Sequence, residues 1–234
     1  NHASFVFNGV DGNALLTLLD VEGFACSSGS ACKTGDPEPS GVLLALGLSK
    51  AWALGSLRVT LGTPTTPAEI EAFLASVPAH VVVVLDEAYG EYLPTDDRCD
   101  TLAWIERFPN LLISRTFSKA YGLAGLRVGY GVGHSDVIDL LNRVRHPFNV
   151  NAPALAAAEA ALDDVEFLLR SYALNRAGMA QLAAGLAGLK IETVPSKGNF
   201  LLARVGDAAR INAELLKRGV IVRPVANYGL PEFL

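Results

Sequence analysis

The chain has 234 residues, half of them hydrophobic, so it is long enough for one large domain or two small ones with a buried core. Its 19 basic and 24 acidic residues give a net charge of −5, and the absence of any dense basic run argues against nucleic acid as a partner. Three cysteines do not make a disulfide framework, and no signal peptide is recognised, so we expect a cytoplasmic protein.

The first 66 residues alternate strand and helix patterns. Thr66, Pro67 and Glu69 have the N-cap, proline and acidic first turn that open a helix. Strands are predicted at 3–7 and 56–62, and helices at 14–19, from 39 toward 46, and from 67 to about 77.

From residue 81 onward the alternation continues with strongly apolar strands. The longest apolar run, Val81–Leu85, is far too short to cross a membrane and suits a buried strand. This pattern predicts an α/β fold, a mostly parallel sheet with flanking helices. Strands are predicted at 81–85, 111–114, 126–131, 190–194, 200–203 and 220–222, and helices at 102–107, 135–144, 208–218 and, as one helix or two in succession, 152–186.

Asp86 directly follows the apolar run, so it should lie at the carboxyl end of a buried strand, where open α/β sheets bind ligands. A carboxylate there can keep a pyridine ring protonated, and Tyr89 is close enough in sequence to donate to a phenolic oxygen on the same ring. The alternative is structural: Asp86 caps a turn and Tyr89 packs.

The run SRTFSKAYGLAGLRVGY carries an amine, hydroxyls and a cation. Lys119 can hold an aldehyde as a Schiff base, and Thr116, Ser118 and Arg127 can bind a phosphate. An isolated lysine among small residues is more often solvated surface. Together with Asp86, however, this set predicts a site for pyridoxal 5′-phosphate and no metal.

Residues from about 67 to 234 resemble the later part of histidinol-phosphate aminotransferase, a homodimeric family of fold-type I pyridoxal phosphate enzymes. The similar segments are VVVVLDEAYGEYL, PNLLISRTFSKAYGLAGLRVGYGV, LLNRVRHPFNVN, SKGNFLL and LLKRGVIVRPVANYGLPEFL. The resemblance implies amino transfer between histidinol phosphate and 2-oxoglutarate, with Lys119 as the catalytic amine and base. It also implies that Asn199 and Arg223 line the pocket of a small-molecule substrate.

Residues from 1 to about 62 resemble instead the carboxy-terminal segment of a group I cysteine desulfurase, on NHASF, VDGNALL, SSGSAC, EPSGVLLALGL and GSLRVTLG. That resemblance implies that Cys32 carries a persulfide and that Arg58 pairs with a substrate carboxylate. A lone cysteine in a Ser/Gly loop is otherwise an ordinary small thiol.

The sequence thus predicts a composite chain with three parts. Residues 1–66 are the desulfurase-like segment, 67–150 the second half of an aminotransferase large domain, and 151–234 a long helical link with a truncated small domain. Small α+β elements are expected at both ends of this partial fold. Against the aminotransferase family, the first half of the large domain and the terminal arginine are missing. Three interpretations stay open: an aminotransferase with impaired activity, a non-catalytic protein that binds a cofactor or a partner, and a sulfur carrier acting through Cys32.

Overall fold

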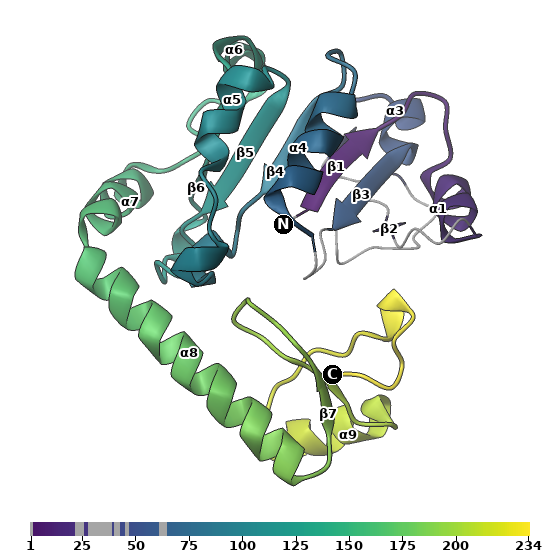
Figure 1. The fold of residues 1–234 in the computed structure, drawn as a ribbon, viewed down its shortest axis with the longest axis vertical. Coiled ribbons are helices and arrows are strands. Elements are labelled where there is room, and N and C mark those ends of the chain that lie inside the picture. The colour runs from purple at the N-terminus through teal and green to yellow at the C-terminus, as the bar shows by residue number, and fades with distance from the viewer. Residues whose placement is uncertain (1, 22–25, 28–38, 40–42, 45–46, 61–64) are drawn as a thin grey trace. The chain divides into compact units, whose positions relative to one another are not determined.

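The computed structural model describes all residues except 1, 22–25, 28–38, 40–42, 45–46 and 61–64 (Figure 1). The chain divides into two compact units, Asn1–Gly90 with Thr95–Asp163, and Glu91–Pro94 with Asp164–Leu234. Within the described ranges, no helix combines the length and apolar character that a membrane span requires.

The first sheet belongs to the amino-terminal segment. Strand β1 (His2–Val6) pairs antiparallel with β3 (Ser56–Thr60), and β3 pairs antiparallel with β2 (Cys26–Ser27). Helices α1 (Gly12–Val21) and α3 (Lys50–Leu54) accompany it. The strands predicted at 3–7 and 56–62 and the helix at 14–19 are therefore confirmed, with small shifts at their ends, whereas most of the predicted helix from 39 to 46 falls outside the described residues.

The second sheet carries the residues that the sequence singled out. Strand β4 (Val83–Asp86) runs parallel to β5 (Leu111–Thr116), and β5 runs antiparallel to β6 (Gly129–Gly133). The α/β class is confirmed, but this sheet is mixed. The link from β5 to β6 contains only one 3₁₀ turn, Ala124–Leu126, and without a crossover helix the chain returns antiparallel.

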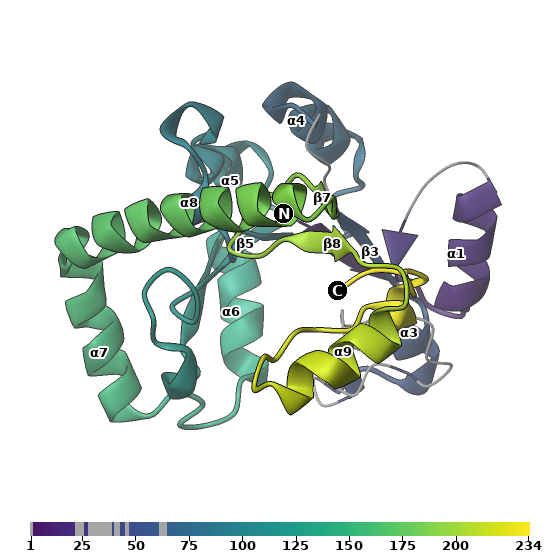
Figure 2. The same cartoon turned by 90° about the horizontal axis from the view of Figure 1, so that it is seen from below.

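Helices cover both faces of the second sheet. Figure 2 shows α4 (Pro67–Ser76) and α5 (Trp104–Arg107) on one side and α6 (Ser135–Val144) on the other. The start of α4 is as predicted: the Thr66 hydroxyl accepts a hydrogen bond from the Glu69 N–H, and the Glu69 carboxylate accepts one from the Thr66 N–H at 2.7 Å.

One of the buried hydrophobic clusters of the first unit joins its two sheets. Leu111 and Ile113 of β5 have no exposed surface, and Val83 of β4 is 2% exposed. Leu57 of β3 belongs to the same buried cluster, and β1 contacts β4. The amino-terminal segment therefore covers the side of β4 that does not pair with β5, which removes apolar surface from water and shields an open strand edge.

The predicted helical stretch from 152 to 186 forms two helices. Helix α7 (Ala152–Asp163) ends the first unit, and α8 (Val165–Gly188) begins the main part of the second. Between them, the Asp164 carboxylate accepts a hydrogen bond from the Phe167 N–H at 2.9 Å and caps α8. The second unit continues with an antiparallel pair, β7 (Glu192–Val194) and β8 (Leu202–Arg204), and with α9 (Ala208–Lys217).

The strand predicted at 220–222 is wrong. Those residues lie in irregular structure, and Ile221 is 85% exposed. Both edges of β8 are already occupied, because β7 pairs with one and Leu234 exchanges two backbone hydrogen bonds with Ala203 at the other. An apolar β-branched run becomes a strand only where a neighbouring strand offers a free edge. The remaining elements are the 3₁₀ turns at Gly90–Tyr92, Thr95–Asp97, Thr101–Ala103 and Ala226–Tyr228.

Candidate functional site

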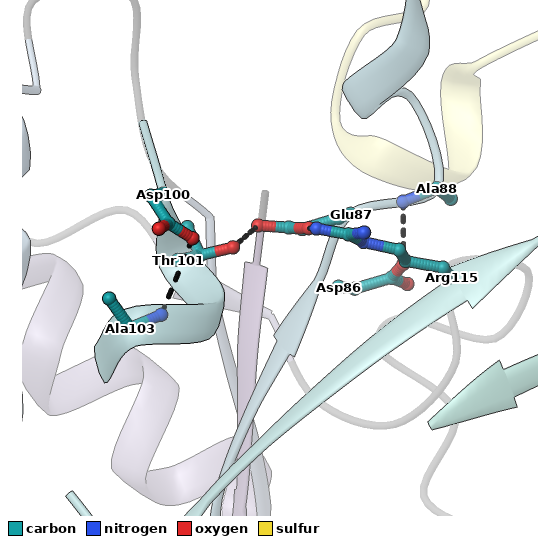
Figure 3. Close-up of polar contacts among 7 residues, drawn as sticks. All are labelled: Asp86, Glu87, Ala88, Asp100, Thr101, Ala103 and Arg115. Carbon is teal, nitrogen blue, oxygen red and sulfur yellow. Dashed lines mark hydrogen bonds and ion pairs between the residues drawn. The ribbon is translucent and has the colours of Figure 1, made fainter. Parts of the chain in front are cut away.

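The carboxyl end of β4 presents two of the predicted residues. Asp86 is the last residue of β4, opposite Ser114 of β5, and its Oδ1 accepts a hydrogen bond from the Ala88 N–H at 3.0 Å (Figure 3). Tyr89 follows in the turn after the strand, and both side chains are half-buried. The carboxylate and the phenol therefore lie at the edge of the sheet where the sequence predicted them.

The loop after β5 holds Lys119 between two buried neighbours. Phe117 and Ala120 are 3% and 2% exposed, whereas Lys119 itself is exposed. The Phe117 carbonyl accepts a hydrogen bond from the Leu123 N–H at 2.9 Å, and its N–H donates to the Val128 carbonyl. The backbone on both sides of the lysine is thereby fixed, and the amine is left accessible.

The two sequence motifs meet at Lys119 and Tyr89. The Lys119 Nζ lies 5.1 Å from the centroid of the Tyr89 ring, within the range of a cation–π contact. The Tyr89 phenol and the Lys119 amine, 30 residues apart in the chain, thus lie together, and the Asp86 carboxylate comes three residues before the phenol, at the end of β4. The loop geometry brings an amine and an acid to one edge of the sheet.

Hydroxyl and guanidinium donors gather next to the lysine. The Arg127 Nη1 donates to the Ser118 Oγ at 3.4 Å and to the Ala124 carbonyl at 3.1 Å, and the Thr116 Oγ1 accepts from the Ser118 N–H at 3.1 Å. Arg127 has a φ of 54°, in the left-handed region that non-glycine residues rarely occupy. Such backbone strain concentrates at functional sites, and here it directs a cation toward the hydroxyl of Ser118.

Glycine at the start of β6 lets the strand lie close to β5. A Cβ on Gly129 would stand 2.7 Å from the carbonyl oxygen of Arg115, closer than real Cβ atoms approach. Gly129 pairs with Thr116, so the absence of a side chain keeps Thr116 and Arg127 on adjacent, hydrogen-bonded backbone. Any larger residue at position 129 would push these phosphate-binding candidates apart.

A polar group that the sequence reasoning did not assign lies beside Asp86. The Glu87 carboxylate accepts hydrogen bonds from the Arg115 Nε at 2.8 Å and from the Thr101 hydroxyl at 2.6 Å (Figure 3). Burial alone lowers the pKa of the Arg115 guanidinium, but hydrogen bonds to Tyr130 and Glu87 outweigh it, and the pKa lies above its ordinary value.

Strand alternation could have revealed this group. Val83 and Leu85 are the buried positions of β4, and Leu111 and Ile113 those of β5. Continuing each alternation by two residues puts Glu87 and Arg115 on the core side of neighbouring strands. A charged residue on the core side needs a partner of opposite charge, and two such residues on neighbouring strands can pair with each other.

The remaining predicted residues lie elsewhere. Asn199 and Arg223 are exposed residues of the second unit, Asn199 just before β8 and Arg223 in irregular structure after α9. Arg58 is in β3, where it pairs with Ser4 and Ser27 of the neighbouring strands. Cys32 falls outside the described residues. No group of His, Cys, Asp or Glu with the arrangement of a metal site is found in the part of the chain that the structure describes.

The sequence profile of the family described as "Aminotransferase class I and II" matches residues 60–234, three quarters of the chain. The chain therefore belongs to the class I and II aminotransferase family. The match begins inside β3 and covers the second sheet, the lysine loop and the whole second unit.

Within that family the chain is similar to histidinol-phosphate aminotransferases. "Histidinol-phosphate aminotransferase 1" of Thiobacillus denitrificans is 83% identical over 166 residues, 71% of this chain and 43% of the relative. The enzyme of the same name in Cupriavidus pinatubonensis is 61% identical over 177 residues, 74% of this chain and 47% of the relative. The chain thus spans less than half the length of these two relatives.

A solved structure shows the same fold. Histidinol-phosphate aminotransferase from Sinorhizobium meliloti, crystallised in complex with pyridoxal 5′-phosphate, aligns with a TM-score of 0.66 and 30% identity, over 74% of this chain and 48% of that chain. The α/β architecture of this chain is therefore that of part of a fold-type I aminotransferase, a mixed sheet with flanking helices.

Proposed function

We propose that this chain provides the lysine-bearing part of a pyridoxal phosphate-dependent aminotransferase that moves an amino group between histidinol phosphate and 2-oxoglutarate. The observation that carries the proposal is the Lys119 amine, 5.1 Å from the Tyr89 ring centroid, at the sheet edge where Asp86 ends β4. The names of the similar enzymes support the choice of substrate.

The chemistry of the residues at this edge fits pyridoxal phosphate. The cofactor needs an amine for its aldehyde, an acid for its ring nitrogen and donors for its phosphate. Lys119 supplies the amine, Asp86 the acid and Tyr89 a donor for the phenolic oxygen. Its phosphate would take hydrogen bonds from Ser118, Thr116 and Arg127, a set in which Arg127 already donates to the hydroxyl of Ser118.

Bound pyridoxal phosphate supplies an electron sink that stabilises negative charge on the substrate carbon. Three side chains of the chain provide the rest. The Asp86 carboxylate keeps the ring nitrogen protonated, Tyr89 orients the ring, and the Lys119 Nζ takes a proton from the substrate carbon and returns it. Phe117 and Ala120, both buried, hold the backbone so that this amine keeps its place during the transfer.

The rest of the predicted organisation belongs to the same proposal. Residues 67–150 would be the second half of the large domain and residues 151–234 the link and small domain, in which Asn199 and Arg223 bind substrate. We infer a cytoplasmic homodimer, as expected for a histidine-biosynthetic enzyme of this family.

Reduction with borohydride tests the proposal directly. The purified chain is titrated with pyridoxal phosphate, reduced and digested, and the labelled peptide is identified by mass spectrometry. We expect the label on Lys119 and its loss in Lys119→Ala. The matched control is Lys217→Ala, which removes an exposed lysine whose amine pairs with Glu214 at 2.7 Å on α9 and should leave the label unchanged.

Three outcomes would contradict the proposal or part of it. If the wild-type chain takes no label at position 119, the interpretation as a non-catalytic protein is favoured. Equal labelling in wild type and Lys119→Ala would mean that pyridoxal phosphate reacts with surface lysines only. A chain that takes the label but transfers no amino group would keep the cofactor site and lose the proposed reaction.

A second candidate function concerns the amino-terminal segment, most of which the family match does not cover. We propose that residues 1–66 are a desulfurase-like segment in which Cys32 carries sulfur as a persulfide and Arg58 binds a carboxylate. The motifs SSGSAC and GSLRVTLG favour it, as does an antiparallel sheet separate from that of the aminotransferase part. After mixing with an active cysteine desulfurase, persulfide should form on Cys32 and vanish in Cys32→Ser; no persulfide on Cys32 would reject this function.

A further inference from the structure

Three charged or polar side chains, Glu87, Arg115 and Thr101, form a compact network on the core side of the second sheet. The side chains of Glu87 and Arg115 are only 14% and 27% exposed, and Thr101 is 5% exposed. Arg115 reaches the Glu87 Oε2 with both Nε and Nη2, each at 2.8 Å, while the Thr101 hydroxyl donates to Oε1. Both oxygens of a half-buried carboxylate are therefore satisfied.

The network is directly connected to the acid side of the candidate site. Glu87 directly follows Asp86 in the chain and lies two residues before Tyr89. Its N–H donates to the Ser114 carbonyl at 2.9 Å, so backbone and side chain both hold it against β5. Since strand alternation puts Asp86 and Glu87 on opposite faces, fixing Glu87 on the core side fixes Asp86 on the other.

The network also reaches the lysine side. Arg115 lies directly opposite Tyr130 across the β5–β6 pair, and the Tyr130 side chain is one of the groups that raise the pKa of its guanidinium. The Tyr130 ring packs on Phe117, with centroids 5.6 Å apart, and Phe117 precedes Ser118 and Lys119. A continuous series of contacts thus runs from Glu87, which follows Asp86, to Phe117, which precedes Ser118.

We propose that Glu87 is a positioning residue that, through Arg115 and Thr101, sets the placement of Asp86 and Tyr89 relative to Lys119 and thereby the affinity for pyridoxal phosphate. This inference rests on the proposed cofactor site. Removing the charge of Glu87 leaves the Arg115 guanidinium half-buried without its counter-ion, and the strand ends shift to rehydrate it. The cofactor-binding groups on both strand ends then lose their alignment.

A second carboxylate in the same unit provides a matched control. Glu71 of α4 also takes one neutral donor and one arginine: the Trp104 Nε1 at 2.9 Å and the Arg107 Nη1 at 2.6 Å. It joins α4 to α5, and neither of these two partners belongs to the strand ends or to the lysine loop. Glu71→Gln and Glu87→Gln therefore remove the same charge from the same kinds of partner, one away from the site and one beside it; the Glu71 side chain is 33% exposed and that of Glu87 14%.

The experiment measures two quantities for the wild type, Glu87→Gln and Glu71→Gln: the dissociation constant of pyridoxal phosphate, from its absorbance on titration, and the thermal midpoint without cofactor. We expect about tenfold weaker binding in Glu87→Gln, because Asp86 and Tyr89 lose part of their alignment with Lys119 once the charged hydrogen bonds of Glu87 are gone. Glu71→Gln should lower the midpoint and leave the dissociation constant unchanged. Thr101→Val, which removes one donor and keeps the shape, should weaken binding in the same direction.

The outcomes separate the inference from the proposed function. If the wild type binds the cofactor and Glu87→Gln and Thr101→Val bind it equally well, the positioning role is wrong and the cofactor site stands. If Glu71→Gln weakens binding as much as Glu87→Gln, the effect is general destabilisation, and the positioning role is again rejected. If the wild type does not bind pyridoxal phosphate, the proposed function fails and the inference fails with it.

Discussion

The second sheet of the first unit and the main part of the second unit, residues 164–234, place the predicted residues in opposite kinds of surroundings. Around the sheet, Leu111 and Ile113 are fully buried, and the candidate cofactor-binding residues lie at or just after the ends of strands that this core fixes. In the second unit, helix α8 has no buried residue, and Ile221 is 85% exposed. The backbone around Lys119 is held by the buried core of the first unit, whereas Asn199 and Arg223 lie on exposed segments of the second.

This difference matters for how much chemistry the chain can support. A side chain on the end of a strand in a packed sheet has few accessible positions, because the strand cannot move without disturbing the core. Exposed residues on irregular segments have many accessible conformations, and ordering them on binding costs free energy. We therefore expect cofactor binding to survive in this chain better than substrate recognition.

Two isoleucine substitutions test the comparison most strongly. Ile113→Ala removes a side chain with no exposed surface and should cost about 2–5 kcal/mol of unfolding free energy. Ile221→Ala makes the same chemical change at an 85% exposed position and should alter stability by less than about 0.5 kcal/mol. Urea denaturation followed by circular dichroism measures both.

Both tryptophans, Trp52 and Trp104, belong to the first unit, so their fluorescence follows that unit separately. Ile113→Ala should shift this signal to lower urea concentration. Similar costs for the two substitutions would show that the second unit depends on packing around Ile221 as much as the first depends on Ile113, and the comparison would fail.

Two arginine substitutions, one in each unit, extend the comparison from stability to the binding of cofactor and substrate. Arg127→Ala removes the guanidinium that donates to Ser118, and we expect the affinity for pyridoxal phosphate to fall about 10- to 100-fold, the range for a hydrogen bond between charged groups. Arg223→Ala should leave cofactor affinity unchanged and weaken only the binding of an anionic substrate. Fluorescence titration with cofactor, and then with substrate, distinguishes the two; a cofactor effect of Arg223→Ala equal to that of Arg127→Ala would contradict the division of roles.

The sequence was most informative where local patterns and burial agree. The apolar run before Asp86 predicted a buried strand with a polar residue at its carboxyl end, and β4 ends at Asp86. The capping pattern at Thr66 predicted the start of α4. The whole of α6 was predicted at its observed bounds, since its amphipathic period is unbroken between Ser135 and Val144. In each case the signal lies within about ten residues of chain.

Prediction failed where the outcome depends on distant partners. Val220–Val222 has strand-forming residues, but β7 and Leu234 already occupy both edges of β8. The antiparallel return of β6 depends on the fold of the lysine loop, which residue periodicity does not reveal. Glu87 and Arg115 were both within quoted motifs, yet their pairing requires the register of β4 on β5. Contacts between strands are decided by tertiary structure, to which a single sequence gives only indirect access.

Helix caps test whether the two units unfold independently. Thr66→Ala removes the cap of α4 in the first unit, and Asp207→Ala that of α9 in the second, where the Asp207 carboxylate accepts from the Arg210 N–H at 3.0 Å. Each should cost about 1 kcal/mol. Tryptophan fluorescence should register the first and not the second, whereas circular dichroism should register both. Equal shifts of the fluorescence midpoint would mean that the units unfold together.

The smallest expected effect is the pH dependence at the same α4 cap. Hydrogen bonds from the Thr66 backbone N–H and then from its hydroxyl lower the pKa of Glu69 below its ordinary value of 4.5. A lowered folded-state pKa stabilises the fold above the unfolded value, and the contribution is lost as the pH falls through the folded value. Glu69→Gln should therefore be less stable than wild type at pH 7, and the gap in thermal midpoint should close as the pH drops below 4.5. The capping box depends on residues three apart in the chain and on no core packing. A gap in thermal midpoint that stays constant with pH would show that the glutamine amide caps α4 as well as the carboxylate does. The charge of Glu69 would then contribute nothing to the stability of the first unit.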